Sequence, residues 1–322
     1  MLTLKEQKVL AALEFDAEKS VETIKKESGL SEHTIRYYQH EFLRNGIIKR
    51  QPIIDLCRAG YIYIGLFFNP ASRSREVQTI IKRSILPRVE IVWLAEFVGE
   101  FRYGMAIAGR DMRSIDNTIT DLVTKFPFLF RSKSVVHQLS SSFFARKYLP
   151  KTNKKSASTI QIAPALEAPD LDLNDKRILA GLVADGAISR RQLAQTLGMP
   201  LTTIDYRVER LKKSGILRGF NYAINPKAVE RQKYMLLVFG SGMNAKFTQA
   251  ISNFAEKHPD VVSLYRCLGW WDFELDLETP DHTSALEIAD ELQSLCKEWV
   301  SSIRILSGVR TLKYTLVPFG TR

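Results

Sequence analysis

The apolar residues near position 180 recur with the spacing of an amphipathic helix. They form a stripe of Leu173, Ile178, Leu179 and Leu182. Ser189 is a favourable N-cap, so a second helix should begin after it and end at Gly198, because glycine commonly ends helices. A third helix should begin at Leu201 and end at Gly215, followed by a short two-strand ribbon within 216–224. The pattern predicts three helices and a ribbon.

The first 50 residues repeat this pattern. Residues 2–50, aligned with 171–219 without a gap, are identical at 13 of 49 positions. The identities include the turn glycines, since Gly29 meets Gly198 and Gly46 meets Gly215. Internal repetition of this kind indicates a repeated structural unit. We therefore expect helices at 4–14, 20–28 and 32–45 and a ribbon after Gly46.

The remainder of each repeat alternates strands and helices in the order βαββαβ, which predicts a ferredoxin-like unit. In the first repeat the elements should lie at 61–69, 73–86, 89–98, 101–108, 112–125 and 132–144, and in the second at 234–240, 246–258, 261–269, 273–279, 282–298 and 302–317. The fold class is therefore α+β. The expected domains are 1–56, 57–149, 171–229 and 230–322, joined by a flexible linker at 150–170 that is rich in Lys, Ser, Ala and Pro.

Composition narrows the class of protein. Of the 322 residues, 45% are apolar and 25% charged, as in ordinary globular proteins. No apolar stretch approaches the ~20 residues of a transmembrane helix, and the N-terminus mixes both signs of charge, unlike a secretory signal. Cys57, Cys267 and Cys296 lie far apart, which argues against a thiolate metal cluster and fits a reducing compartment. We expect a cytoplasmic protein that is not bound to a membrane.

The net charge is +11 and is unevenly distributed, with +6 in residues 51–150 and −1 in residues 223–322. A basic chain can bind polyanions, but many proteins carry such a charge for solubility alone. The charge therefore leaves both interpretations open.

Three helices followed by a ribbon are typical of a winged helix-turn-helix, whose second motif helix enters the DNA major groove. On a helical wheel Ile204, Val208 and Leu211 share one face and should be buried. The other side carries hydroxyls, an aromatic ring and cations, which suit phosphates and base edges. The predicted DNA contacts there are Thr202, Thr203, Tyr206, Arg207, Arg210 and Lys213. The alternative is an ordinary surface helix with a solvated basic face.

The corresponding helix of the first repeat is less basic. Its core positions should be Ile35 and Phe42, and because Gln39 aligns with Val208, Tyr38 is expected to turn inward. The predicted outward contacts are His33, Thr34, Arg36, Tyr37 and Arg44, offset by nearby acidic residues. Either this helix reads DNA with another preference, or it serves mostly the fold.

Residues 171–229 resemble the N-terminal domain of the leucine-responsive and asparagine-operon regulators, the Lrp/AsnC family. The matching features are Leu171-Asp172, Ile178-Leu179, Leu193-Ala194, Gly198, Thr203-Ile204, Arg207-Val208, Arg210-Leu211, Gly215-Ile216 and Asn225-Pro226. The resemblance covers nearly the whole chain. It implies dimers assembled through the sensory sheets, small-molecule effectors that are often amino acids, and transcriptional regulation of genes through double-stranded DNA.

This sequence departs from the family pattern in three ways. Two full units share one chain, Pro200 replaces the serine that normally caps the recognition helix, and Tyr38 and Arg102 stand where the second repeat has Arg207 and Asp272. Two linked units can form an intrachain pseudo-dimer, because the linker keeps their effective concentration high. Since the two recognition helices differ, we expect an asymmetric operator with half-sites about one helical turn, or multiples, apart.

The candidate effector site is a turn between two strands. The second repeat supplies Gly269, Trp270, Trp271 and Asp272, and the first supplies Gly99 and Arg102. The tryptophans would line a pocket in which Asp272 receives an ammonium group, and Arg102 would suit an anion instead. Alternatively, the tryptophans fill an interface core and Asp272 shapes the turn. A sensor without a ligand is a third interpretation.

An enzymatic signature is missing from the sequence. The histidines are scattered without metal-ligand spacing, and neither a nucleophile elbow nor a phosphate-binding glycine loop occurs, so we expect no cofactor and no metal. Glu274, Asp276 and Glu278 alternate on one strand face, where a solvated edge is expected. Two rivals stay open. Siroheme decarboxylases resemble the same fold as two paired units, and a metabolite-sensing module could act on protein partners without DNA.

Overall fold

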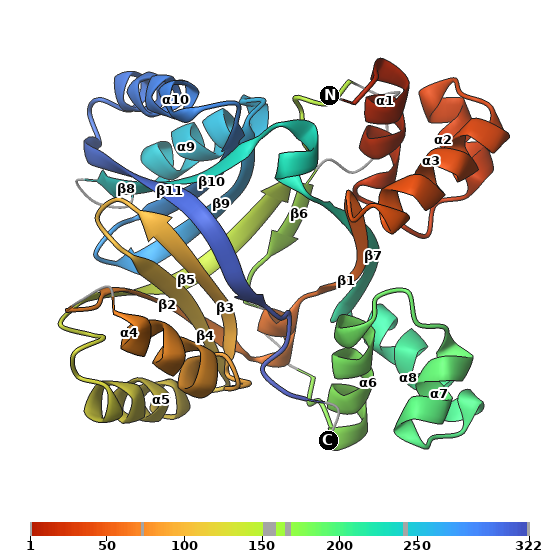
Figure 1. Cartoon of the computed structure of the whole chain (residues 1–322), viewed down its shortest axis with the longest axis horizontal. Helices are drawn as coiled ribbons and strands as arrows, with labels where there is room; N and C mark the ends of the chain where they lie inside the picture. The colour runs from red at the N-terminus through yellow and green to blue at the C-terminus, as the bar shows by residue number, and fades with distance from the viewer. Residues whose placement is uncertain (1, 72–73, 151–158, 165–168, 241–243, 321–322) are drawn as a thin grey trace.

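The computed structural model describes residues 2–71, 74–150, 159–164, 169–240 and 244–320. Two small helical domains stand on one side, and a large β-structure flanked by helices stands on the other (Figure 1). The two halves of the chain repeat the same order of elements. The α+β class, with winged helix-turn-helix and ferredoxin-like domains, is confirmed.

The first half begins with the three helices of a helix-turn-helix domain and continues with a βαββαβ unit. Its elements are α1 (Leu4–Leu13), α2 (Val21–Ser28), α3 (Glu32–Arg44), β1 (Ile48–Ile54), the short 3-10 helix η1 (Leu56–Ala59), β2 (Ile62–Asn69), α4 (Arg75–Ile80), the π-helical η2 (Ile81–Ile85), β3 (Ile91–Val98), β4 (Tyr103–Gly109), α5 (Met112–Lys125) and β5 (Ser132–Phe144).

The second half follows the same plan after one extra strand. Its elements are β6 (Thr159–Ile162), α6 (Leu173–Ala184), α7 (Arg190–Leu197), α8 (Leu201–Lys213), β7 (Leu217–Ile224), η3 (Pro226–Val229), β8 (Gln232–Gly240), α9 (Ala245–Lys257), β9 (Val261–Gly269), β10 (Phe273–Thr279), α10 (His282–Leu295) and β11 (Val300–Tyr314). Apart from β6, these elements lie within a few residues of the predicted ones.

The ribbons predicted within each repeat are wrong. Each is a single strand, and β1 pairs with β7 of the other repeat, so that Ile48 faces Ile224 and Ile54 faces Leu217. The physical reason is that each strand has apolar residues at both ends that need cover from different domains. Ile48 lies in the core of the first helix-turn-helix, whereas Ile54 lies in the core of the second. We call this two-stranded sheet the β1–β7 ribbon.

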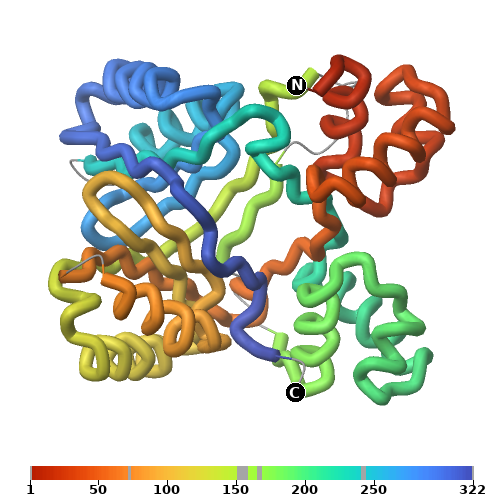
Figure 2. Tube along the Cα trace, viewed as in Figure 1, coloured from red at the N-terminus to blue at the C-terminus, as the bar shows by residue number. Residues whose placement is uncertain are grey.

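The remaining strands form one sheet in the order β2-β4-β3-β11-β8-β10-β9-β5-β6, with a further pairing between β2 and β5. That pairing closes the first eight strands into a barrel. The long strands β5 and β11 join the halves, because each pairs with its own unit first and then with the other unit. Thus β5 runs from β2 to β9, and β11 from β8 to β3. Figure 2 traces both crossings.

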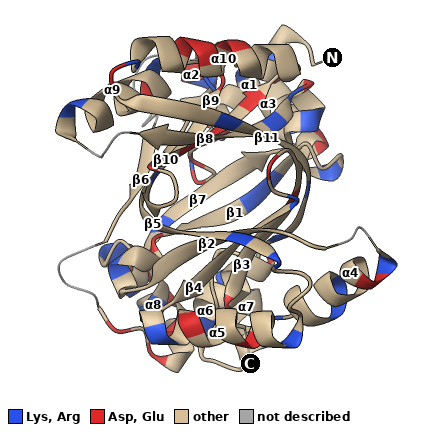
Figure 3. Ribbon diagram, turned by 90° about the vertical axis from the view of Figure 1, so that its left-hand side faces the viewer, with Lys and Arg blue, Asp and Glu red and all other residues tan. Residues whose placement is uncertain are grey.

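Helices cover the outer faces of the barrel. In Figure 3 its strands lie between α9 and α10 on one side and α4 and α5 on the other. Each pair of helices seals a core of its own, and a third core lies between the two halves. That interface core contains Phe67, Phe97, Phe101, Trp271 and Leu306. The two ferredoxin-like units are therefore joined by both main-chain pairing and apolar packing.

Part of the expected linker is ordered into a strand. Residues 159–162 form β6, which pairs antiparallel with the end of β5, Phe144 facing Thr159. This segment differs from the flexible tether that its composition predicted, because its main-chain groups extend the free edge of β5. The stretches 151–158 and 165–168 of the predicted linker lie outside the described residues.

Candidate nucleic-acid interface

The second helix-turn-helix is defined by its caps. Ser189 accepts the main-chain N–H of Gln192 at the start of α7, and Gly198 ends that helix with φ +64°, a left-handed conformation that glycine tolerates best. Pro200 starts α8 without any side-chain cap, as the sequence indicated. Ile204, Val208 and Leu211 are buried, so the predicted core face of α8 is confirmed.

The outward face of α8 carries part of the predicted contact set. Thr202, Tyr206 and Lys213 are exposed, Tyr206 by 69%, and Thr203 is half-buried near the start of the helix. Arg190 from α7 lies across this helix and pairs with Asp205 (3.0 Å) and Glu209 (2.5 Å). One guanidinium thereby offsets part of the negative charge of the two acidic side chains of α8, which favours approach of a polyanion.

Arg207 and Arg210 have partners inside their own domain. Arg207 donates to both carboxylate oxygens of Asp172, at 2.8 and 2.7 Å, and to Asp175 at 3.0 Å. Arg210 donates to Asp175, whose side chain is fully buried. These hydrogen bonds, first of all those to Asp172, raise the pKa of Arg207. Arg207 therefore ties α8 to α6, while Arg210 keeps 44% of its side chain exposed. A contact of either arginine with DNA stays a prediction.

The outward face of α3 differs from that of α8. His33 and Tyr37 are exposed and Thr34 is half-buried, but Arg36 is paired with Glu32 (2.7 Å) and Arg44 with Glu41 (2.6 Å). These pairs are the acidic offset expected from the sequence. They leave α3 an aromatic and imidazole surface rather than a cationic one.

The inner face of α3 also follows the sequence. Ile35 and Phe42 are buried, and Tyr38 turns inward and stacks on Phe42 with ring centroids 5.8 Å apart. Gln39 donates to the hydroxyl of Tyr222 in β7 (2.8 Å), a contact between the two repeats. The position that breaks the apolar pattern of α3 therefore serves to attach it to the β1–β7 ribbon.

The predicted effector turn of the second repeat lies at the interface between the halves. Trp271 is 1% exposed, meets Phe67 edge-on at 5.0 Å, and donates to Glu274 at 2.9 Å. Asp272 accepts the main-chain N–H of Gly240 (2.6 Å), and Trp270 is 44% exposed beneath the guanidinium of Arg304 (4.8 Å). This arrangement is the interface-core alternative. An effector role for the turn stays a prediction.

The turn of the first repeat is built in the same way. Gly99 has φ +138°, and a Cβ atom there would lie 2.9 Å from the carbonyl oxygen of Ile305 in β11. Gly269 has φ +152°, and a Cβ atom there would lie 2.7 Å from the carbonyl oxygen of Val135 in β5. Arg102 donates to Glu96, a buried carboxylate that Arg310 also contacts at 2.6 Å. Glu96 is thus shared by two guanidinium groups, and an anion-binding role for this turn stays a prediction.

The three carboxylates of β10 are not a solvated edge, so that prediction is wrong. Glu274 and Glu278 are each 1% exposed, and Asp276 accepts the hydroxyl of Ser263 at 2.6 Å. The reason is that both faces of this central strand are covered. The alternating Phe273, Leu275 and Leu277 pack under α9 and α10, and the barrel encloses the other face. Burial raises the pKa of Glu274 to about 7, against the hydrogen bond from Trp271.

The described residues include no group of three or more His, Cys, Asp or Glu side chains arranged to hold a metal ion. None of the helices in the described part of the chain has the length and apolarity to cross a bilayer.

Comparison with known proteins identifies the family. A family model for winged helix-turn-helix DNA-binding domains matches residues 171–218. The transcriptional regulator FL11 of Pyrococcus furiosus is 27% identical over 144 residues, which are 44% of this chain and 87% of FL11. The transcriptional regulator AldR of Mycolicibacterium smegmatis is 33% identical over 118 residues, 36% of this chain and 68% of AldR.

The chain belongs to the Lrp/AsnC family. As a member of this family it is a DNA-binding transcriptional regulator of the helix-turn-helix type. One solved structure is similar over the whole length. The siroheme decarboxylase NirDL aligns with 98% of this chain and 94% of its own at a TM-score of 0.62 and 13% identity, a likeness that concerns the fold alone.

Sequence reasoning missed two features of this Lrp/AsnC protein. One is the set of hydrogen bonds from Arg207 and Arg210 to the buried Asp175, the third residue of α6, whose immediate neighbours along the chain are polar and gave no sign of its burial. The other is a buried charge cluster around Arg146, contacting Glu14 and Glu278. Arg146 lies 132 positions from each of the two carboxylates along the chain, so no local sequence pattern connects them.

Proposed function

We propose that this regulator binds DNA as an intrachain pseudo-dimer, with α3 and α8 on two dissimilar half-sites of one asymmetric operator. The observation that carries the proposal is the β1–β7 ribbon, which joins both helix-turn-helix domains main chain to main chain. Lys212 at the end of α8 adds a second bridge, since it donates to Glu18 of the first domain at 2.9 Å. Two helix-turn-helix domains joined in this way would present α3 and α8 at a fixed separation.

The outward faces supply the difference between half-sites. Tyr206 and Lys213 on α8 suit phosphates and base edges, and His33 and Tyr37 give α3 a less cationic surface. Arg207 and Arg210 are poor probes of this contact, because their substitution would also remove the partners of the buried Asp175. Exposed side chains on the two helices test it without that complication.

The test is selection of duplexes from a random library by the full chain, followed by footprinting of Tyr206→Ala with Lys213→Ala, and separately of Tyr37→Ala with His33→Ala. We expect two protected half-sites of different sequence, about one helical turn or multiples apart. Each double variant should weaken a different one. Protection of one short site that only the α8 variant disturbs would overturn the proposal, and protein that binds no duplex at low salt would favour a module acting on protein partners.

We also propose a division into domains and a small-molecule effector. The winged helix-turn-helix domains would span 1–56 and 171–229, the ferredoxin-like sensor domains 57–149 and 230–322, and the linker 150–170. A small effector of amino-acid type, as the family resemblance implies, would act on the sensor domains. Thermal unfolding with each of the twenty amino acids tests this, because a ligand that binds only the folded state raises Tm. No shift with any of them would indicate a regulator without such an effector.

We further propose that the protein regulates transcription and is not an enzyme. It would work in the cytoplasm, where its duplex target lies. Its pseudo-dimers would associate into larger assemblies. The regulator relatives match by sequence, whereas the decarboxylase matches by fold. Titration with siroheme separates the two functions, since binding changes the absorption spectrum of the tetrapyrrole. A bound, decarboxylated product would overturn the assignment. Sedimentation equilibrium would reveal assemblies larger than one chain.

A further inference from the structure

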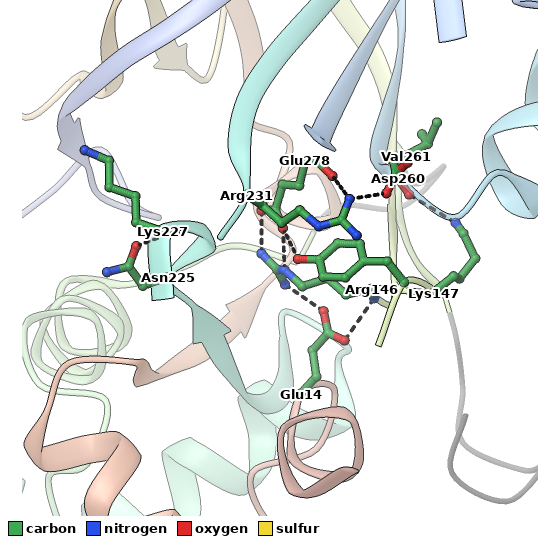
Figure 4. A network of polar contacts seen from close by, with 10 residues as sticks. Glu14, Arg146, Lys147, Asn225, Lys227, Arg231, Asp260, Val261 and Glu278 are labelled. Atoms are coloured by element: carbon green, nitrogen blue, oxygen red, sulfur yellow. Dashed lines mark hydrogen bonds and ion pairs between the residues drawn. The ribbon is translucent and has the colours of Figure 1, made fainter. Parts of the chain in front are cut away.

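A buried cluster of charges joins the first helix-turn-helix to the barrel. Arg146 follows β5 and donates to Glu14 at the end of α1 (2.7 Å) and to both carboxylate oxygens of Glu278 in β10 (2.7 and 2.8 Å). The main-chain N–H of Arg146 donates to the second oxygen of Glu14 at 3.0 Å. Tyr148 donates its hydroxyl to Glu278 at 2.6 Å. Figure 4 shows Arg146 between the two carboxylates, one from each domain.

The cluster is shielded from solvent. The side chains of Glu14 and Glu278 are 4% and 2% exposed, and that of Arg146 is 15% exposed. Burial raises the pKa of Glu14, while Arg146 acts against the rise. Burial would lower the pKa of Arg146, but the two carboxylates raise it overall. A buried charge that loses its partner is strongly unfavourable, so these groups stay paired only while the two domains keep one relative position.

The barrel side of the cluster is braced by further contacts. The guanidinium of Arg231 lies over the ring of Tyr148 at 4.3 Å and bonds Asp260 at 2.7 Å. The ammonium of Lys147 donates to the carbonyl oxygens of Ala255 and Val261 at 3.1 and 3.0 Å. Arg146 is therefore held in place by the second ferredoxin-like unit, and Glu14 is the group that the first helix-turn-helix brings to it.

The positions equivalent to Glu14, Arg146 and Glu278 in the other half of the molecule carry no charge. Gly99 packs on Leu306 as Gly269 packs on Val136, which fixes the correspondence of the two halves at an offset of 170. At that offset Leu316 replaces Arg146 and Ala108 replaces Glu278, and at the offset of 169 for the helical domains Val183 replaces Glu14. Val183 and Leu316 pack against the core of the second helix-turn-helix. The three charged positions of one half thus correspond to three apolar positions of the other half.

We propose that Arg146 is a positioning residue that fixes the first helix-turn-helix on the second ferredoxin-like unit and thereby sets the orientation of α3 toward its half-site. Fork-shaped hydrogen bonds of a guanidinium define one geometry, whereas apolar contacts are non-directional. The second helix-turn-helix does not depend on this cluster. The two domains therefore respond differently to the same kind of substitution. The part that concerns α3 and its half-site rests on the proposed function, and the part that concerns docking does not.

The test is hydrogen exchange of the full chain, read separately over α1–α3 and α6–α8, for Arg146→Met. We expect exchange in α1–α3 to accelerate roughly 100-fold, because two buried carboxylates lose their cation, with little change in α6–α8. Arg146→Lys keeps the charge without the fork and should accelerate it less, by about tenfold. The matched control Leu316→Ala should loosen α6–α8 and spare α1–α3.

A triple variant, Glu14→Val with Arg146→Leu and Glu278→Ala, copies the other half and should return the protection of α1–α3 to near the wild-type level. If Arg146→Met does not fold, this triple variant still tests whether the charged cluster can be replaced by apolar residues. On a selected operator, Arg146→Met should lose the half-site of α3 and keep that of α8. Equal acceleration in both domains, or less than about threefold in α1–α3, overturns the docking role. Loosened α1–α3 with unchanged footprints overturns only the link to DNA.

Discussion

The two helix-turn-helix domains share a sequence pattern and differ in how their recognition helices are attached. In the second domain Arg207 and Arg210 of α8 bond the buried Asp175 of α6. The equivalent of Asp175 in the first domain is Glu6, which serves in an exposed capping box with Thr3, and the positions of the two arginines hold Tyr38 and Glu41. One scaffold can therefore fix its recognition helix either by internal ion pairs, as for α8, or by apolar packing and a hydrogen bond to a neighbouring strand, as for α3.

The largest expected effect comes from breaking the ion pair of the second domain. Asp175→Ala removes the buried carboxylate that Arg207 and Arg210 both bond and should destabilise α6–α8 by about 3 kcal/mol, the loss expected for hydrogen bonds to a charged group. Glu6→Ala, its counterpart, removes only an exposed capping contact and should cost about 1 kcal/mol or less. Urea unfolding followed by hydrogen exchange of each domain measures both. Equal losses in the two domains would show that Asp175 has no special role.

The next effect is a pH dependence of stability that only the second half of the barrel should contribute. Burial raises the pKa of Glu274 to about 7, whereas the equivalent position of β4 is Gly104. The folded state therefore holds a proton that the unfolded state releases, and its stabilising contribution is present below about pH 4.5 and is lost as pH rises through about 7. The loss should amount to about 3 kcal/mol at most.

Glu274→Gln removes the titrating carboxyl group, and the amide oxygen of the new side chain can still accept the hydrogen bond from Trp271. Free energies of unfolding measured from pH 4.5 to 8 should fall less steeply in the variant than in the parent chain. Parallel curves for the two proteins would contradict the assignment. Gly104→Ala serves as a control for the other half, since it adds no titrating group, although Phe67 must shift to admit the new methyl group.

The smallest effect concerns the starts of the recognition helices. Ser31 accepts the N–H of Thr34 at 3.2 Å and caps α3, but Pro200 gives α8 no such bond. Ser31→Ala should lower stability by about 1 kcal/mol. Pro200→Ser should raise it by less than that, because the new cap is offset by the lost rigidity of proline. Thermal unfolding checks both, and a destabilised Pro200→Ser would mean that the proline ring is the better start for α8.

The features predictable from sequence are those that depend on neighbours along the chain. Periodicity and caps predicted the turn at Gly198, the buried face of Ile204 and Val208, and the order of helices and strands along the chain. The pairing of β1 with β7, the engagement of Arg207 and the burial of Glu274 were not predictable in this way. Each depends on which distant surface covers a residue, and an alternating strand shows which side chains share a face without showing what covers that face.

We propose that the ribbon and the barrel hold two different recognition helices at one separation. The direct measurement is affinity for the selected operator after insertion of five base pairs between its half-sites, about half a helical turn. The account predicts that affinity falls to that of a single half-site, because a rigid pair cannot follow the rotation. Affinity unchanged by the insertion would show that the two domains move independently on DNA, and would contradict the account.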